Sequence, residues 1–189
     1  MTATLTPPRI LTVDDDPIVR ADLRVILEDA GFSVVPDARD GDEAVEHARE
    51  HAPDLIVLDL GLPGLDGFDA ASRILSERDV PIVALTGHNE PEILKRAADA
   101  GAGSYVLKPF SEAALLGTIR QALAARREAV ERESNLQKHH LLVMIESMVR
   151  ENASEREIVR ALKQADASWE PEPSVWQSAG SLARRIVGR

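Results

Sequence analysis

The sequence predicts an α/β protein built on a doubly wound, five-stranded parallel β-sheet, and two observations support this fold class. First, short apolar runs rich in β-branched residues alternate with stretches that repeat apolar residues at helical spacing, as in strand–helix units. Second, the run Leu55-Ile56-Val57-Leu58 is apolar throughout, as expected of a strand that is covered on both faces. Right-handed crossovers then place helices on both faces of the sheet.

The first two predicted strands flank a helix. Residues 10–13 and 32–35 are short apolar runs typical of strands. Pro17 suits the first turn of a helix, and Gly31 suits its end. Between them, apolar residues recur at helical spacing, so we expect one helix to join the two strands.

The remaining elements follow in the same alternation, separated by turn residues such as Pro53 and Gly101. The predicted order is a helix over 43–51, a strand over 55–59, a helix over 68–76, a strand over 81–85, a helix over 92–100, a strand over 104–107 and a helix that begins at Ser111.

The helix that begins at Ser111 continues beyond the predicted sheet domain. Neither Gly nor Pro interrupts residues 118–152, and the apolar positions give way to a charged stretch over 126–140. We predict a helical stalk there, although its heptad pattern is poor for a coiled coil. A second apolar patch follows at Leu141, Leu142, Met144, Ile145, Met148 and Val149.

Two further helices are predicted near the C-terminus. Ser154 with Glu157, and Ser174 with Gln177, form capping-box patterns ahead of apolar residues at helical spacing. The predicted organisation is therefore a loose leader over 1–8, a sheet domain over 9–125, the stalk over 126–140 and a small three-helix output or interaction module over 141–189.

Charge and composition exclude several classes of protein. Residues 1–125 carry 11 Lys and Arg against 22 Asp and Glu, whereas residues 126–189 carry 11 against 10, so the first part repels nucleic acid. No apolar run reaches about 18 residues, and we expect no membrane span. The chain has no Cys, which excludes disulfides and thiolate zinc sites, and we expect a cytoplasmic protein.

Polar side chains stand at the ends of four predicted strands: Asp14 with Asp15, Asp59, Thr86, and Lys108. Because the carboxyl ends of parallel strands meet at one edge of a sheet, we expect them to converge. A carboxylate pair suits Mg²⁺, and an ammonium and a hydroxyl suit phosphoryl oxygens. Together they favour phosphoryl chemistry over the ordinary roles of each residue in turns, helix starts or solvent.

Residues 9–125 resemble the receiver domain of two-component response regulators. The resemblance rests on Val13-Asp14-Asp15-Asp16-Pro17, on Asp59 followed by Leu62-Pro63 and Asp66-Gly67, on Thr86, and on Lys108-Pro109-Phe110. It implies the strand order 2-1-3-4-5 and a sensor histidine kinase or phosphotransfer protein as partner. It also implies no enzyme activity beyond self-phosphorylation and hydrolysis of the chain's own phosphoryl group.

The same resemblance implies a role for each residue of the site. Asp59 would accept the phosphoryl group, which Thr86 and Lys108 would bind. Tyr105 would change rotamer with Thr86, and the Lys108–Pro109 bond would be cis. The ligands of Mg²⁺ would be Asp14, Asp15, Asp59 and the backbone carbonyl of Gly61.

The chain also resembles regulators that carry an ANTAR domain, which bind RNA hairpins in antitermination. This resemblance rests on Arg20-Ala21-Asp22-Leu23, Phe68-Asp69-Ala70-Ala71-Ser72, Ser154-Glu155-Arg156-Glu157 and Leu182-Ala183-Arg184-Arg185-Ile186-Val187. The Ala-Lys-Gly element of that family's first helix is replaced by Val143-Met144-Ile145-Glu146.

Three interpretations of the C-terminal module therefore stay open. An RNA binder would contact phosphates through Arg150, Arg156, Arg160, Lys163, Arg184 and Arg185. A DNA-binding helix-turn-helix would have its turn at 152–154. A protein-interaction or dimerisation module is favoured by Trp169, Trp176 and the Met-bearing patch, and includes a homodimer through the 111–150 helix. An internal core explains the same residues equally well. The neighbouring His139 and His140 do not face the same way on a helix, and we expect both to be solvated.

Overall fold

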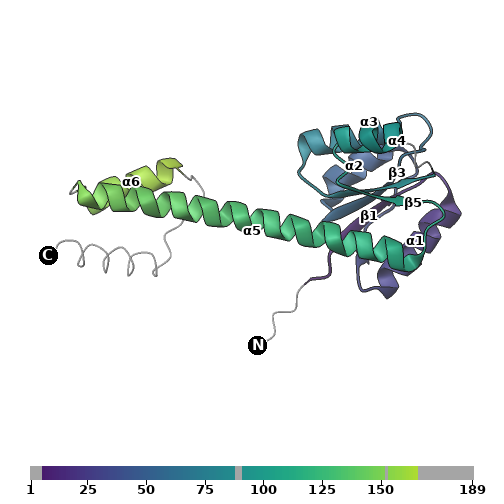
Figure 1. Cartoon of the computed structure of the whole chain (residues 1–189), viewed down its shortest axis with the longest axis horizontal. Coiled ribbons are helices and arrows are strands. Elements are labelled where there is room, and N and C mark those ends of the chain that lie inside the picture. The colour runs from purple at the N-terminus through teal and green to yellow at the C-terminus, as the bar shows by residue number, and fades with distance from the viewer. Residues whose placement is uncertain (1–5, 88–90, 152, 166–189) are drawn as a thin grey trace. The chain divides into compact units, whose positions relative to one another are not determined.

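The structure is a computed structural model that describes residues 6–87, 91–151 and 153–165 (Figure 1). The chain divides into two compact units, Met1–Arg127 and Glu128–Arg189. The first unit holds the sheet and its covering helices. In the part of the chain that the structure describes, no helix is both long enough and apolar enough to cross a membrane.

The first unit contains the predicted parallel sheet. Its strands are β1 (Arg9–Val13), β2 (Ser33–Val34), β3 (Leu55–Asp59), β4 (Ile82–Thr86) and β5 (Ser104–Leu107), in the order β2-β1-β3-β4-β5. All four pairings are parallel, which confirms the predicted topology. Val13 pairs with Leu58 and Asp59 pairs with Leu85, so β1, β3 and β4 end at nearly the same level.

Helices cover both faces of the sheet (Figure 1). They are α1 (Pro17–Asp29), α2 (Gly41–His51), α3 (Gly67–Glu77), α4 (Pro91–Asp99) and the first part of α5 (Glu112–Arg150). One core cluster joins α2, α3 and α4 to the sheet through Ala44, Ile74 and Ala97. A second joins α1 and α5 to the opposite face through Leu23, Leu115 and Ile119. The buried core is almost wholly aliphatic, as the 3% aromatic content implies.

Aspartate side chains begin three of these helices. Asp16, Asp40 and Asp66 accept hydrogen bonds from the N–H groups of Ile18, Glu43 and Asp69 at 2.8, 2.9 and 2.9 Å. The cap at Asp40 explains why α2 begins at Gly41, two residues before the predicted start. β2 is two residues long rather than the predicted four, although the Val35 N–H still donates to the Ile10 carbonyl at 3.0 Å.

The second unit contains the later turns of α5 and helix α6 (Glu155–Ala165). Ile145, Ile158 and Leu162 are buried, with Leu141, Met144, Met148 and Ala153 packed against them. The prediction that Leu142 belongs to this patch is wrong, because its side chain is 52% exposed. His139 and His140 are both exposed. The predicted helix after Ser174 lies outside the described residues.

At the start of α6, Ser154 and Glu157 interact as a capping pair. The Glu157 carboxylate accepts from the Ser154 N–H at 2.7 Å and from its hydroxyl at 2.6 Å. The hydrogen bonds with the Ser154 hydroxyl and N–H lower the Glu157 pKa below its usual value. The carboxylate half of the predicted capping box is therefore present.

Candidate phosphoryl-accepting site

The polar residues at the strand ends converge at the carboxyl edge of the sheet. Asp14 and Asp15 follow β1, Asp59 ends β3, Thr86 ends β4 and Lys108 follows β5. Asp14, Asp59 and Thr86 are 1%, 8% and 3% exposed, whereas the rest of the buried interior is largely apolar. This is the edge at which parallel α/β sheets place their ligands.

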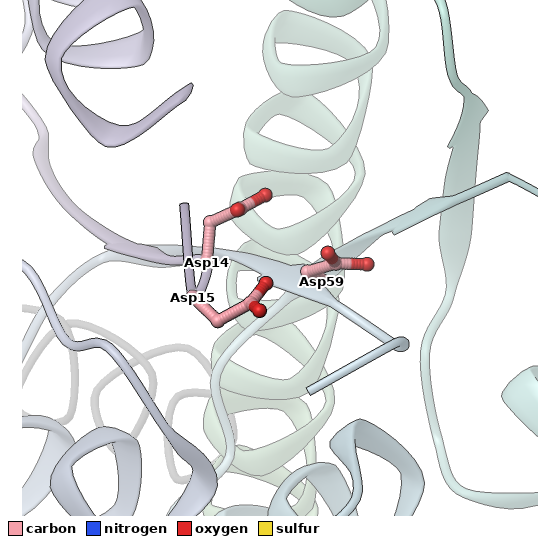
Figure 2. A group of neighbouring side chains, drawn as sticks. All are labelled: Asp14, Asp15 and Asp59. Carbon is pink, nitrogen blue, oxygen red and sulfur yellow. The ribbon is translucent and has the colours of Figure 1, made fainter. Parts of the chain in front are cut away.

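Three carboxylates gather at this edge (Figure 2). One oxygen from each of Asp14, Asp15 and Asp59 lies within 4.8 Å of the others. Hard divalent cations such as Mg²⁺ prefer carboxylate oxygens, so this donor set fits Mg²⁺. Among the described residues, no other group of three or more carboxylate, imidazole or thiol side chains is arranged to hold a metal ion.

Lys108 joins two of these acids. Its Nζ lies 2.6 Å from Asp14 Oδ2 and 2.8 Å from Asp59 Oδ2. Burial by itself would lower the Lys108 pKa, but the hydrogen bonds to Asp14 and Asp59 raise it above its usual value. The ammonium group is therefore charged at neutral pH.

The pKa of Asp14 is raised in the same environment. Burial of its carboxyl is the largest cause, and the hydrogen bond with Lys108 opposes it. Since burial disfavours the charged form of an acid, a cation beside Asp14 is needed to keep a negative charge there. Lys108 supplies that charge in this structure.

Backbone amides orient the two acids. The Gly61 N–H donates to Asp59 Oδ1 at 3.0 Å, while the Asp16 N–H donates to Asp14 Oδ1 at 2.9 Å. Each carboxylate thus has one oxygen held by the backbone and the other by Lys108. Both acids are fixed by the loops that follow their own strands.

A close approach of α3 supports the Asp59 loop. A Cβ atom on Gly67 would collide with the Asp59 carbonyl oxygen and with the Leu60 Cα. Glycine at the first position of α3 therefore lets this helix begin directly against the end of β3.

An ion-pair cluster that sequence reasoning missed supports the acid pair from behind. Arg20 Nη1 donates to the Asp14 carbonyl at 2.7 Å and to the Asp15 carbonyl at 3.2 Å. Its Nε donates to Asp37 Oδ2 at 2.6 Å, and Arg24 donates to Asp37 Oδ1 at 3.0 Å. Arg20 lies one turn after Asp16, so helical spacing brings it back to the loop, but no sequence signal marks Asp37 as its partner.

The residues at the end of β4, within β5 and directly after β5 complete the predicted set. The Lys108 N–H donates to the Thr86 carbonyl at 2.7 Å, and the Lys108–Pro109 peptide bond is cis. Tyr105 is 48% exposed, on a strand that pairs with β4 through Ala84. Its ring is thus largely solvent-accessible.

The predicted nucleic-acid contacts belong to the second unit. Arg150 and Arg160 are exposed on α5 and α6. Arg156 and Lys163 lie on α6, but their side chains are outside what the structure describes. Arg184 and Arg185 lie outside the described residues altogether.

Comparisons with known proteins agree with this geometry. The chain is 44% identical over 122 residues to the "Transcriptional regulatory protein PdtaR" of Mycobacterium tuberculosis, which covers 65% of this chain and 60% of that protein. The chain thus spans less than two thirds of this relative's length.

Solved structures show the same fold. The chemotaxis protein CheY4 of Vibrio cholerae is 30% identical with a TM-score of 0.59, covering 61% of this chain and 98% of that one. A structure of a CheX–CheY–BeF₃–Mg complex from Borrelia burgdorferi is 26% identical with a TM-score of 0.59, and the match covers 61% of this chain and 88% of that one. The sequence profile of the response regulator receiver domain matches residues 10–120, and the chain therefore belongs to the response regulator receiver family of two-component systems.

Proposed function

We propose that the receiver accepts a phosphoryl group on Asp59, from a sensor histidine kinase, a phosphotransfer protein or a small acyl phosphate. The observation that carries this proposal is that Asp59 lies beside the carboxylates of Asp14 and Asp15 and contacts the Lys108 ammonium group. The acids provide a site for a cation, and the ammonium provides a partner for phosphoryl oxygens.

In the proposed step, a carboxylate oxygen of Asp59 attacks phosphorus in line with the leaving group. The new P–O bond forms as the P–N bond of a phosphohistidine, or the P–O bond of an acyl phosphate, breaks. The bonding electrons leave with the imidazole nitrogen or the acyl oxygen. Such transfers are accelerated by positioning and by charge stabilisation, and need no covalent chemistry from other residues.

In the proposed site, the carboxylates of Asp14, Asp15 and Asp59 would hold Mg²⁺, together with the backbone carbonyl of Gly61, which stays a prediction from the sequence. When bound, Mg²⁺ would supply positive charge against the phosphoryl oxygens. Lys108 exchanges its bond with Asp59 for one with a phosphoryl oxygen, and the Thr86 hydroxyl donates to another. Movement of Thr86 toward Asp59 leaves room for Tyr105 to turn inward from its exposed position.

Beryllofluoride, a stable mimic of a phosphoryl group, tests this proposal. We expect saturable binding to the full chain in Mg²⁺, with no binding to the Asp59→Asn variant or in EDTA. Asp69→Asn is the matched control, because Asp69 is an exposed acid on α3. Equal binding by the Asp59→Asn and unsubstituted proteins would contradict the proposal.

We further propose that the second unit is the output and contacts RNA phosphates through Arg150, Arg156, Arg160, Lys163, Arg184 and Arg185. The exposure of Arg150 and Arg160 supports this, as does the relative's name as a transcriptional regulatory protein. The test is binding to a pool of structured RNA, with duplex DNA as control, with and without beryllofluoride. We expect activator-dependent RNA binding that weakens with salt. Binding to neither polymer in either state would contradict it.

A second candidate output is a homodimer formed through α5. Leu136 and Val143 are 66% and 52% exposed and lie seven residues apart, on one stripe of the helix. Apolar side chains at this spacing favour pairing with a second helix. Sedimentation velocity with and without beryllofluoride tests this, and an unchanged monomer in both states would exclude it.

A further inference from the structure

A cavity of about 410 Å³ opens at the edge of the sheet opposite Asp59. Arg9 begins β1 there, while Pro53 with Asp54, and Val80 with Pro81, precede β3 and β4. We call it the basal pocket, and its lining belongs entirely to the first unit. It is lined by Thr6, Pro7, Pro8, Arg9, Pro53, Asp54, Arg78, Asp79, Val80, Pro81, Leu123, Arg126 and Arg127.

The lining is positively charged within a strongly acidic unit. Four arginines and two aspartates give it a formal charge of +2. By contrast, residues 1–125 carry 22 acidic side chains against 11 basic ones. A local excess of positive charge in such a domain is a feature that an anion would recognise.

Among the residues that the structure describes, Arg126 alone of these four arginines forms an ion pair with an acid. Arg126 Nη1 lies 2.6 Å from Asp79 Oδ2, whereas Asp54 accepts instead from the backbone N–H of Arg9 at 2.8 Å. Within the described parts of the chain, no carboxylate pairs with the guanidinium groups of Arg9, Arg78 or Arg127. Three guanidinium groups thus remain for an external acceptor.

Arg78 is also incompletely hydrogen-bonded. Its Nη2 donates to the Pro53 carbonyl at 3.4 Å, a long hydrogen bond. Its Nε is buried and has no hydrogen-bond partner among the described residues. A hydrogen bond of this length is weak, so a ligand oxygen that accepts from the Arg78 guanidinium group would gain from it.

The apolar part of the lining limits the size and kind of ligand. Pro7, Pro8, Pro81, Val80 and Leu123 form walls without an aromatic ring, and the volume is in the range of small-molecule sites. Guanidinium groups match phosphate and carboxylate oxygens in pairs.

We propose that the basal pocket binds a small multivalent anion, a polyphosphate or polycarboxylate of at most nucleotide size. Such a ligand bridges Arg127 on α5 to Arg9 at the start of β1. Because α5 continues from Arg127 into the second unit, the ligand gives this helix a second input that is independent of phosphorylation at Asp59.

The test uses the full chain with Asp59→Asn, in EDTA and at low salt, so that the carboxylate site cannot contribute. Pyrophosphate, ATP and citrate are titrated by calorimetry. We expect at least one of them to bind saturably. The double variant Arg9→Gln/Arg127→Gln should weaken binding at least tenfold.

The matched control is Arg120→Gln/Arg132→Gln, which removes the same charge from exposed positions outside the basal pocket. This control should bind the anions as tightly as the Asp59→Asn chain does. Thermal unfolding verifies that both double variants fold. Equal binding of pyrophosphate and ATP assigns recognition to the phosphates, whereas tighter ATP binding assigns part of it to the apolar walls. Absence of binding by all three anions, or equal loss in both doubles, would overturn the proposal.

Discussion

The ammonium nitrogen of Lys108 lies 2.8 Å from Oδ2 of Asp59, so the proposed acceptor already has a cationic partner. The same nitrogen contacts Asp14 at 2.6 Å, and Lys108 therefore occupies the region where a metal cation and a phosphoryl group would sit. Its positive charge offsets part of the negative charge of these acids, and we expect Lys108 to compete with a cation for them.

Replacement of Lys108 by Gln should separate these two effects. Loss of a positive charge beside Asp14 and Asp59 should tighten Mg²⁺ binding by about tenfold, equivalent to about 1.4 kcal/mol. Phosphorylation by an acyl phosphate should be slower, because a phosphoryl oxygen loses its cationic partner. Calorimetry and a phosphorylation time course measure the two, with the exposed Lys95→Gln as control. Weaker Mg²⁺ binding in Lys108→Gln would refute the account.

Arg20 should act as a positioning residue for the acid pair. Lysine cannot reproduce its simultaneous bonds to the Asp14 and Asp15 carbonyls and to Asp37. Arg20→Lys should fold but bind Mg²⁺ about tenfold more weakly, as for the loss of partners that orient metal ligands. Arg73→Lys, which alters an exposed ion pair with Asp42, is the control and should bind Mg²⁺ normally. Unchanged Mg²⁺ affinity in Arg20→Lys would show that Arg20 serves the fold alone.

Asp37 should make stability depend on pH. Burial would raise its pKa, but hydrogen bonds from Arg20 and Arg24 outweigh burial and hold the pKa below its usual value. A lowered folded-state pKa stabilises the fold above the unfolded value of about 3.9, and this stabilisation is lost as pH falls through the folded-state pKa.

The Asp37→Asn variant should therefore unfold about 1 kcal/mol more easily at pH 7, a modest value because the ion pairs are partly exposed. The difference in the free energy of unfolding between this variant and the unsubstituted protein should disappear as the pH falls below about 4. Urea unfolding across pH measures it, with Asp42→Asn as an exposed control. A difference that stays constant down to the lowest pH would rule out this ion pair as its source.

Gly67 should tolerate no side chain. A Cβ there would collide with backbone atoms of Asp59 and Leu60, so Gly67→Ala should lower the free energy of unfolding by about 3 kcal/mol. Gly117→Ala is the matched control on α5, where a Cβ meets no described atom within 4 Å. This substitution should raise the free energy of unfolding by about 0.5–1 kcal/mol. Equal effects of the two substitutions would contradict the close approach of α3 to β3.

The convergence of polar residues at the strand ends was predictable, because a parallel sheet brings the carboxyl ends of its strands to one edge however its helices pack. Alternation of apolar runs with helical patterns was enough to place Asp14, Asp59, Thr86 and Lys108 at one edge. The predicted start of α2 lies two residues after the observed one, because Gly41 has low helix propensity. The structure requires glycine there for another reason: a Cβ at Gly41 would collide with Leu65.

Features built from several distant segments were not predictable. The Arg20–Asp37 pair joins residues 17 positions apart, across a loop whose path no local pattern specifies. The basal pocket depends on the starts of β1, β3 and β4 meeting the interior of α5, and this meeting brings together arginines from distant parts of the chain. The exposure of Leu142 depends on which face α6 covers, because its neighbours Leu141 and Ile145 pack inward.

The most direct measurement is the intact mass of the full chain after treatment with an acyl phosphate and Mg²⁺, followed by borohydride reduction and peptide mapping. We expect one added phosphoryl group before reduction, with the reduced residue mapping to Asp59. We expect no phosphoryl group in EDTA or in Asp59→Asn. A phosphoryl group that persists in Asp59→Asn, or none on the unsubstituted protein, would contradict the assignment of Asp59 as the acceptor.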